Sequence, residues 1–390
     1  MNPFDLNLNF RVIFSPGASG RVGEIAQIYK ARRVMIVMDA GIQKAGLQAQ
    51  LLESLRRYRM EVSIFTEVEP NPTTQNVDSG VTRAKEFSPD LIVALGGGSS
   101  LDAAKAINML RTYRGQIADY RGGLPASSKL PPLVAIPTTA GTGAEVSPFI
   151  LISDSVSHAK IVLRGAQMTP DISILDPTLT ISLPRQVTII TGIDALVHGL
   201  EATVAKGSPL FSQALGLEAV RMIYTTLPEV VESPGDLDGR GKMIVASNLA
   251  GMAFAYSYLG LSHSLANPLT RVAGMVHGMA VGMMLPYIIL FNEPVARNDY
   301  AALAARILGN RTPSDAREAN RRLAASLKEF LGRLGYPPSL KKCGVLRDLI
   351  PEMAAEAVIQ PSARANPREA NLEDIKKLYY QAYEGEEVFG

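Results

Sequence analysis

Short apolar runs alternate with amphipathic helical segments through the first half of the chain. The apolar runs cover residues 34–38, 62–65, 91–95 and 133–136, and the helical patterns cover 22–29, 47–58, 77–87 and 100–109. A strand that is buried on both faces of a sheet has a continuous run of apolar residues in its sequence. Strands that alternate with helices are typical of βαβ units. The pattern therefore predicts a Rossmann-like parallel sheet that is covered by helices and binds ligands at the carboxyl ends of its strands.

After Asp176-Pro177 the strand signals stop and long amphipathic helical segments follow. These cover residues 187–205, 211–226, 241–258, 277–291, 301–308, 315–334 and 372–384. Asn371 stands before the last of them as an N-cap. We expect an α/β domain over residues 1–180 and an all-helical domain over 181–390, with the active site in the cleft between them.

The composition is that of a well-packed globular protein. Of 390 residues, 47% are hydrophobic and 19% are charged, and a net charge of +2 is spread without a block of like charges. The length favours two domains. The even charge gives no reason to expect binding to nucleic acid or to an acidic surface.

Cysteine content and hydropathy predict a cytoplasmic protein. Cys343 is the only cysteine, which excludes an intramolecular disulfide and a cysteine-based metal cluster and fits a reducing compartment. The N-terminus has no basic region followed by an apolar core, so we expect no signal peptide. The longest apolar run, residues 279–291, is interrupted by Pro286 and is too short to span a bilayer, so we expect no membrane contact.

Asp194 and His198 stand four residues apart in an apolar segment with helical spacing. Residues i and i+4 lie on the same face of a helix, so the carboxylate and the imidazole share one space. Buried polar groups need partners, and a divalent metal satisfies both of these.

Two further histidines in the second half, His263 and His277, are flanked by small and apolar residues. A single histidine on an apolar face is usually a core residue, and His158, in the first half, is most simply a loop residue. Three of the four histidines together with Asp194 favour a site for Fe²⁺, Zn²⁺ or Mn²⁺ instead. Ser-His-Asp hydrolysis is a rival interpretation, but no G-x-S-x-G turn accompanies it.

Two loops at predicted strand ends favour a nucleotide. Gly96-Gly-Gly-Ser99 lies between a strand and a helix, where glycines admit a ligand and the free amides of the helix attract phosphate. Pro137-Thr-Thr-Ala-Gly-Thr142 offers hydroxyls and glycine amides at the next strand end. Each loop alone is also compatible with a turn that binds no ligand, and neither follows the G-x-G-x-x-G pattern.

Asp39 and Lys160 are two further candidates, each with an ordinary structural alternative. An acid at a strand end accepts a hydrogen bond from a ribose 2′-OH and repels a 2′-phosphate, but Asp39 also fits a helix N-cap. Lys160 stands in the strand-like residues 160–163. Its side chain either faces a ribose or phosphate of the nucleotide or points into solvent.

Taken in order, the motifs resemble the iron-containing (group III) alcohol dehydrogenase family over nearly the whole chain. The resemblance is carried by Glu69-Pro-Asn71-Pro, Gly96-Gly-Gly-Ser-Ser-Leu-Asp-Ala-Ala-Lys105, Pro137-Thr-Thr-Ala-Gly-Thr-Gly-Ala-Glu145, Asp176-Pro, Thr191-Gly-Ile-Asp-Ala-Leu-Val-His198, Met275-Val-His-Gly278 and Asn366-Pro-Arg368.

The resemblance implies a dinucleotide-binding first domain, a metal-binding catalytic second domain, and a role for each of several side chains. The implied metal ligands, for Fe²⁺ or Zn²⁺, are Asp194, His198, His263 and His277. The implied cofactor residues are Asp39, Asn71, Gly97, Gly98, Ser99, Asp102, Thr138, Thr139, Thr142 and Lys160. Asp39 implies a preference for NAD(H) over NADP(H), Phe149 and Phe254 are implied walls of the substrate pocket, and a homodimer or larger homo-oligomer is expected.

One position departs from the family pattern. The family usually has His-x-x-x-His in the segment that starts at His263, and here the second position is Asn267. The second histidine is a candidate in the family for proton relay or substrate contact. Asparagine hydrogen-bonds but does not titrate, so either the proton leaves through water or ribose hydroxyls, or the substrate preference differs.

We expect an enzyme in which the metal binds the alcohol oxygen as a Lewis acid and hydride passes between a primary alcohol and the nicotinamide. The alternatives are a dehydroquinate-synthase-like or glycerol-dehydrogenase-like enzyme on the same fold, or a non-catalytic nucleotide sensor. Dehydroquinate synthases use Glu where this chain has Asp194 and need clustered basic residues for a phosphorylated substrate.

Overall fold

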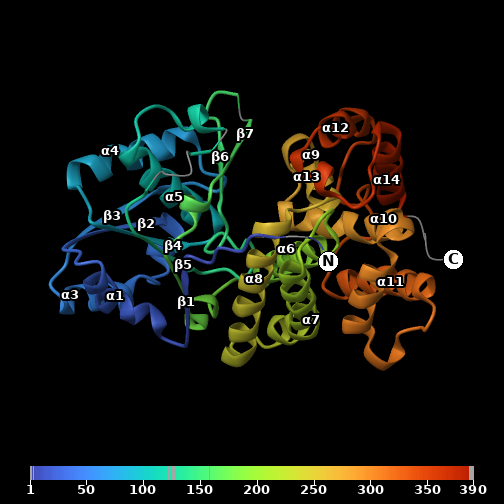
Figure 1. Ribbon diagram of the computed structural model, residues 1–390, viewed down its shortest axis with the longest axis horizontal. Coiled ribbons are helices and arrows are strands. Elements are labelled where there is room, and N and C mark those ends of the chain that lie inside the picture. The colour runs from blue at the N-terminus through green and yellow to red at the C-terminus, as the bar shows by residue number, and fades with distance from the viewer. Residues whose placement is uncertain (1, 3, 122, 125–128, 158, 386–390) are drawn as a thin grey trace. The chain divides into compact units, whose positions relative to one another are not determined.

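The computed structural model describes residues 2, 4–121, 123–124, 129–157 and 159–385 (Figure 1). The chain forms two compact units. The α/β unit comprises Asn7–Leu183 and Pro234–Asn248, and the helical unit comprises Met1–Leu6, Pro184–Ser233 and Leu249–Gly390. These ranges differ from the expected domains 1–180 and 181–390 at three places: residues 1–6 belong to the helical unit, and residues 181–183 and 234–248 belong to the α/β unit.

A six-stranded parallel sheet forms the centre of the α/β unit. Its strands are β1 (Arg11–Phe14), β2 (Arg33–Asp39), β3 (Glu61–Val68), β4 (Leu91–Gly96), β5 (Leu133–Pro137) and β8 (Ile172–Leu175). The order across the sheet is β1-β8-β5-β4-β2-β3, and the neighbouring strands pair in parallel. The predicted Rossmann-like parallel sheet is therefore confirmed.

Helices cover both faces of this sheet, as Figure 1 shows. They are α1 (Val22–Ile28), α2 (Ala40–Lys44), α3 (Ala49–Arg57), α4 (Thr74–Phe87) and α5 (Gly98–Thr112). Alternate residues of β2, β4 and β5 enter opposite cores: Ile92 packs with α4 and α5, whereas Val93 packs with α1 and α3. Because successive strand side chains point to opposite faces, burial on both faces requires the continuous apolar runs seen in the sequence.

The sequence pattern missed three strands. β1 and β8 have four residues each, and β6 (Phe149–Ser153) alternates between buried and part-exposed positions in an antiparallel hairpin with β7 (Lys160–Arg164). Short or half-exposed strands lack the long apolar run on which the prediction relied.

The helical unit is built from α6 (Arg185–Val204), α7 (Leu210–Glu232), part of α8 (Leu237–Ser257), α9 (Leu261–Ala273), α10 (His277–Leu308), α11 (Ala316–Arg333), α12 (Ile350–Ala357), α13 (Pro361–Ala365) and α14 (Leu372–Glu384). α10 packs against α6, α7, α9, α11 and α14. Asn371 caps α14 as predicted, since its side chain accepts from the amide of Asp374.

The segments predicted as helical over residues 277–291 and 301–308 belong to one element, because α10 continues through Pro286 and Pro294 to Leu308 with one non-helical residue, Ala296. Packing on α6, α9 and α11 outweighs the local cost of the prolines. Among the described residues, α6 and the segment His277–Arg311 are long and apolar enough to cross a membrane by length and composition. Their most apolar windows are 83% and 72% buried inside the fold, so packing accounts for their apolar character.

Candidate metal centre and nucleotide loops

Helix α6 presents Asp194 and His198 on one buried face. The side chains are 9% and 7% exposed, and His198 Nε2 lies 3.7 Å from Asp194 Oδ1. The i, i+4 spacing in the sequence therefore produces the expected proximity.

Two other helices bring the remaining histidines to the same carboxylate oxygen. His263 on α9 places Nε2 3.6 Å from Asp194 Oδ1, and His277, the first residue of α10, places Nε2 4.0 Å from it. The His277 side chain is 39% exposed, whereas the His263 side chain is 7% exposed. The cluster is thus buried on one side and open at His277.

Gly278 allows α10 to begin beside α6. A Cβ atom at this position would collide with the backbone carbonyl of Ile190. Tyr336 donates a hydrogen bond to the Gly278 carbonyl over 3.0 Å and holds the helix end in place. The close approach that only glycine permits is what brings His277 to Asp194.

The donor set fits a cation. Asp194 Oδ1 and His263 Nε2 are buried and have no hydrogen-bond partner among the described residues, although buried polar atoms normally have one. Ligand atoms of Asp194, His263 and His277 lie within 4.8 Å of one another. One carboxylate with imidazole nitrogens suits Fe²⁺ or Zn²⁺.

The electrostatics of the cluster favour opposite charges on its members. Burial alone would raise the pKa of Asp194, but the neighbouring His198, His263 and His277 outweigh it and lower that pKa. Burial alone would lower the pKa of His263, but Glu201 and Asp194 raise it to about 9. A proton and a metal cation therefore compete for the His263 ring.

Glu201 belongs to this cluster and was not predicted. Its Oε2 lies 2.6 Å from His263 Nδ1 and accepts from the Gly260 amide at 2.9 Å, and its Oε1 accepts from the Ser262 amide at 2.6 Å. Burial would raise the pKa of Glu201, but His263 and these amides lower it. The signal was present in the sequence, since Glu201 follows Asp194 and His198 at helical spacings of seven and three residues.

Phe254 and Asn267 also lie in the helical unit. The Phe254 ring on α8 packs against the imidazole of His198, with ring centroids 4.7 Å apart. Asn267, on the half-buried side of α9, donates to Gln360 over 3.4 Å. Phe254 therefore borders the histidine cluster, and Asn267 has an amide partner that does not titrate.

In the α/β unit, the two predicted nucleotide loops lie against each other. β4 ends at Gly96 and α5 begins at Gly98. A Cβ atom at Gly98 would come 2.8 Å from Thr142 Cγ2, and one at Gly97 would come 3.5 Å from Thr139 Oγ1. The amides at the start of α5 thus share one strand-end surface with the threonine loop, which suits a phosphate. Thr138 is buried there, and its amide donates to the Gly96 carbonyl.

The remaining polar candidates in this unit surround that surface. Asp39 caps α2 through the amide of Ile42 and accepts from Ser100 Oγ at 3.2 Å. Lys160 Nζ donates to Asn71 Oδ1 over 3.0 Å. The Asn71 amide in turn donates to the side chain of Ser99, so Lys160, Asn71 and Ser99 form a chain of contacts.

Asp102 faces the interior of the α/β unit. It is buried, its Oδ2 accepts from the amide of Leu151, and its Oδ1 lies 3.8 Å from the ammonium of Lys105. Burial raises the pKa of Asp102 to about 6. Phe149 on β6 is half-buried, with the Arg164 guanidinium 5.8 Å above its ring. His158 lies outside the described residues.

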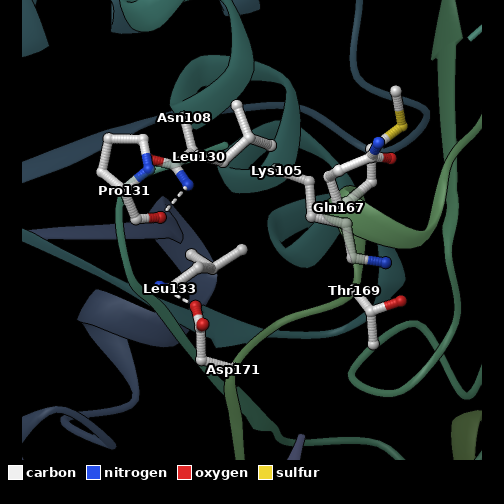
Figure 2. Close-up of a pocket in the computed structure, with 9 residues that line it drawn as sticks. Lys105, Asn108, Leu130, Pro131, Leu133, Gln167, Thr169 and Asp171 are labelled. Atoms are coloured by element: carbon white, nitrogen blue, oxygen red, sulfur yellow. Dashed lines mark hydrogen bonds between the residues drawn. The ribbon is translucent and has the colours of Figure 1, made fainter. Parts of the chain in front are cut away.

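A separate cavity of about 40 Å³ lies beside α5 and β5. Figure 2 shows two hydrogen bonds at the wall of this cavity: the Asn108 side chain donates to the Pro131 carbonyl, and the Leu133 amide donates to the Asp171 carboxylate. This volume holds a few water molecules at most, far less than a dinucleotide needs. None of the predicted cofactor residues lines it.

Comparison with known proteins gives a match over both halves of the chain. Residues 9–177 match the family model described as iron-containing alcohol dehydrogenase, and residues 188–383 match the C-terminal model of the Fe-containing alcohol dehydrogenase family.

Individual proteins agree with these models. The NAD-dependent methanol dehydrogenase of Bacillus methanolicus is 33% identical, with 95% of this chain and 97% of that protein covered. The NADPH-dependent butanol dehydrogenase of Clostridium saccharobutylicum is 33% identical over 92% of this chain and 94% of that protein. A crystal structure of 1,3-propanediol oxidoreductase superposes with a TM-score of 0.95 at 33% identity, covering 98% of this chain and 100% of that one.

Proposed function

Because the chain belongs to the iron-containing alcohol dehydrogenase family and is an alcohol dehydrogenase, we propose that it transfers a hydride between NAD(H) and a primary alcohol/aldehyde pair with a bound metal ion. The observation that carries the proposal is the pair of buried atoms Asp194 Oδ1 and His263 Nε2, which face each other across 3.6 Å without hydrogen-bond partners among the described residues. Two buried acceptors in this arrangement need a cation between them.

In this proposal Asp194, His198, His263 and His277 hold the metal, which is Fe²⁺ or Zn²⁺. When bound, it supplies a Lewis acid that polarises the substrate oxygen, while the nicotinamide supplies or accepts the hydride. The exposed edge of His277 gives the substrate access to the cluster, and the buried side keeps the ligands fixed.

The substrate is a small alcohol or aldehyde. Phe254 packs on His198 and offers an apolar wall beside the cluster, which suits a short or medium alkyl chain better than a polyol. Phe149 is proposed as a second wall. An apolar wall orients the chain of the substrate while the polar end meets the cluster.

The nucleotide is proposed to bind at the carboxyl ends of β4 and β5. Gly97, Gly98 and Ser99 hold the pyrophosphate at the start of α5, where free amides attract anions. The lining residues proposed are Asn71, Asp102, Thr138, Thr139, Thr142 and Lys160. Asp39 carries a negative charge at the end of β2 and is proposed to favour NAD(H) over NADP(H).

The proton of the alcohol is proposed to leave through water or the ribose hydroxyls. Asn267 and its partner Gln360 are both amides, and neither takes up a proton in the physiological range.

A homo-oligomer is also proposed. β1 is an edge strand of the sheet, and its side chains Val12 and Phe14 are 37% and 49% exposed. An apolar edge strand favours pairing with a second copy. We place the enzyme in the cytoplasm, in line with its single cysteine.

The test is anaerobic metal reconstitution followed by a panel of alcohols and aldehydes with NADH and NADPH. We expect turnover that depends on Fe²⁺ or Zn²⁺, and loss of both bound metal and turnover in His263→Ala. Retention of both by that variant contradicts the metal site. Tight NAD binding without turnover on any substrate of the panel contradicts hydride transfer.

A further inference from the structure

Glu201 is a buried carboxylate on α6 that contacts His263 on α9. Its Oε2 lies 2.6 Å from His263 Nδ1, and its side chain is 3% exposed. A neutral imidazole carries its single N–H on one of its two nitrogens, and the hydrogen bond of the other decides which. A carboxylate beside Nδ1 accepts a hydrogen bond from it, so the N–H is held at Nδ1.

The opposite edge of the same ring faces Asp194. With the N–H at Nδ1, Nε2 of His263 presents a lone pair toward Asp194 Oδ1 at 3.6 Å. A lone pair directed at a carboxylate oxygen is useful only when a cation lies between the two atoms.

The position of Glu201 is fixed independently of the histidine. The amides of Ser262 and Gly260, at the start of α9, donate to its two oxygens. Amides at the N-terminus of a helix stabilise a negative charge. Glu201 therefore joins the start of α9 to α6 and remains a hydrogen-bond acceptor when the ring is absent.

We propose that Glu201 is a positioning residue that holds His263 in the Nδ1–H tautomer, so that Nε2 is available to the metal. This inference rests on the proposed metal site. It assigns to Glu201 no contact with substrate or nucleotide, and it predicts that Glu201 acts on metal affinity through His263 alone.

Glutamine at position 201 tests this directly, because it keeps the size of the side chain and replaces one acceptor by an NH₂ group. In one orientation the NH₂ group opposes the Ser262 amide, and in the other it opposes both the Gly260 amide and the Nδ1–H of His263. In the second orientation the conflict with the ring disappears when the imidazole moves its proton to Nε2, which removes the lone pair from the metal side, while the Gly260 amide loses its acceptor.

The experiment measures the Kd for Co²⁺ alone, by chelator competition under anaerobic conditions, on the full chain. The variants are wild type, Glu201→Gln, His263→Ala and the double variant. Thr203→Val is the matched control, since Thr203 is also buried on α6 and its hydroxyl donates to the Gly199 carbonyl.

We expect Glu201→Gln to weaken Co²⁺ binding by about 10- to 100-fold, as loss of a partner of a metal-binding histidine commonly does. In the His263→Ala background the same change should add nothing, because the ring through which Glu201 acts is gone. Thr203→Val should leave the Kd unchanged.

Two results overturn the inference. One is a wild-type Kd in Glu201→Gln, and the other is an equal loss in the presence and absence of the His263 ring, which would mean that Glu201 acts on the fold. If His263→Ala itself leaves the Kd unchanged, the proposed metal site fails instead, so the two failures are distinguished.

Discussion

The imidazole rings of His198 and His263 stack with their centroids 4.7 Å apart and their planes inclined by 14°. The rings come from α6 and α9, and both Nε2 atoms approach the same oxygen of Asp194. In the proposed metal site, these two rings supply two neighbouring ligands beside one carboxylate oxygen.

This stacking predicts that Zn²⁺ stabilises the protein through both rings. A ligand that binds only the folded state adds about 2.7 kcal/mol at a free concentration of 100 Kd. We expect Zn²⁺ to raise the apparent Tm of the metal-free enzyme in proportion to the logarithm of its concentration, and His198→Ala to shift that response to much higher concentrations. Mg²⁺, which prefers oxygen ligands, is the control and should give no response. An unchanged Zn²⁺ response in His198→Ala would remove this ring from the site.

Gly278 should be essential for the position of His277. Alanine at 278 places a Cβ against the Ile190 carbonyl, so α10 must move away from α6. We expect a loss of about 1–3 kcal/mol in stability, measured by chemical denaturation, and weaker Co²⁺ binding. Gly332→Ala in α11 is the control, because its Cβ meets no atom within 4 Å, and it should leave metal binding intact and raise stability by roughly 0.5–1 kcal/mol. Wild-type Co²⁺ affinity in Gly278→Ala would contradict the prediction, since it would mean that moving α10 away from α6 does not affect metal binding.

Much of this architecture could be predicted from the sequence, for physical reasons that differ by element. The strand at Leu91–Gly96 is buried on both faces, so its apolar run identifies it. Helix α9 was not predicted, because Gly260, Asn267 and Pro268 are typical of turns; packing on α10, α12 and α13 overrides those local preferences.

The residues of the candidate site likewise include some that the sequence could predict and some that it could not. Asp194 and His198 could be predicted from helical spacing alone. The contact between Glu201 and His263 joins residues 62 apart in the chain, and no local rule predicts a partner at that separation. The contacts of Asp102 with Lys105 and with the Leu151 amide were not predicted either, because Leu151 stands 49 residues away in the chain.

Gly98 should control nucleotide affinity without affecting the metal. A Cβ at this position comes 2.8 Å from Thr142 Cγ2, so alanine must displace the threonine loop or the start of α5. We expect Gly98→Ala to weaken NADH binding at least about tenfold, which corresponds to roughly 1.4 kcal/mol, as measured by fluorescence titration. The Kd for Co²⁺ should not change. Gly20→Ala, whose Cβ meets no atom within 4 Å, is the control. Equal NADH affinity in Gly98→Ala and the control would place the pyrophosphate elsewhere.

Asp39 should decide between the two nicotinamides. Serine at this position keeps an oxygen that caps α2 at the Ile42 amide while removing the charge that repels a 2′-phosphate. We expect Asp39→Ser to shift the ratio of kcat/KM for NADPH over NADH upward by roughly 10-fold or more, an amount equivalent to about 1.4 kcal/mol. Thermal denaturation should show that the cap is retained. A preference for NADPH in the wild-type enzyme, or an unchanged ratio in the variant, would contradict the role of Asp39.

Histidine at position 267 should introduce a titratable group into the proton path. Asn267 is half-buried on α9 and its side-chain amide donates to Gln360, so an imidazole at this position keeps a polar partner and introduces a group with a pKa of about 6.5. If the wild-type proton leaves through water or ribose hydroxyls, the wild-type profile of kcat against pH has no ionisation at position 267. We expect Asn267→His to add an ionisation between about pH 6 and 7, below which alcohol oxidation falls because the protonated ring no longer accepts the proton. Asn267→Gln is the control, because it keeps a side-chain amide at this position, and it should keep the wild-type pH profile. A profile in Asn267→His that is identical to the profile in Asn267→Gln would separate residue 267 from proton transfer and leave it a role in substrate contact alone.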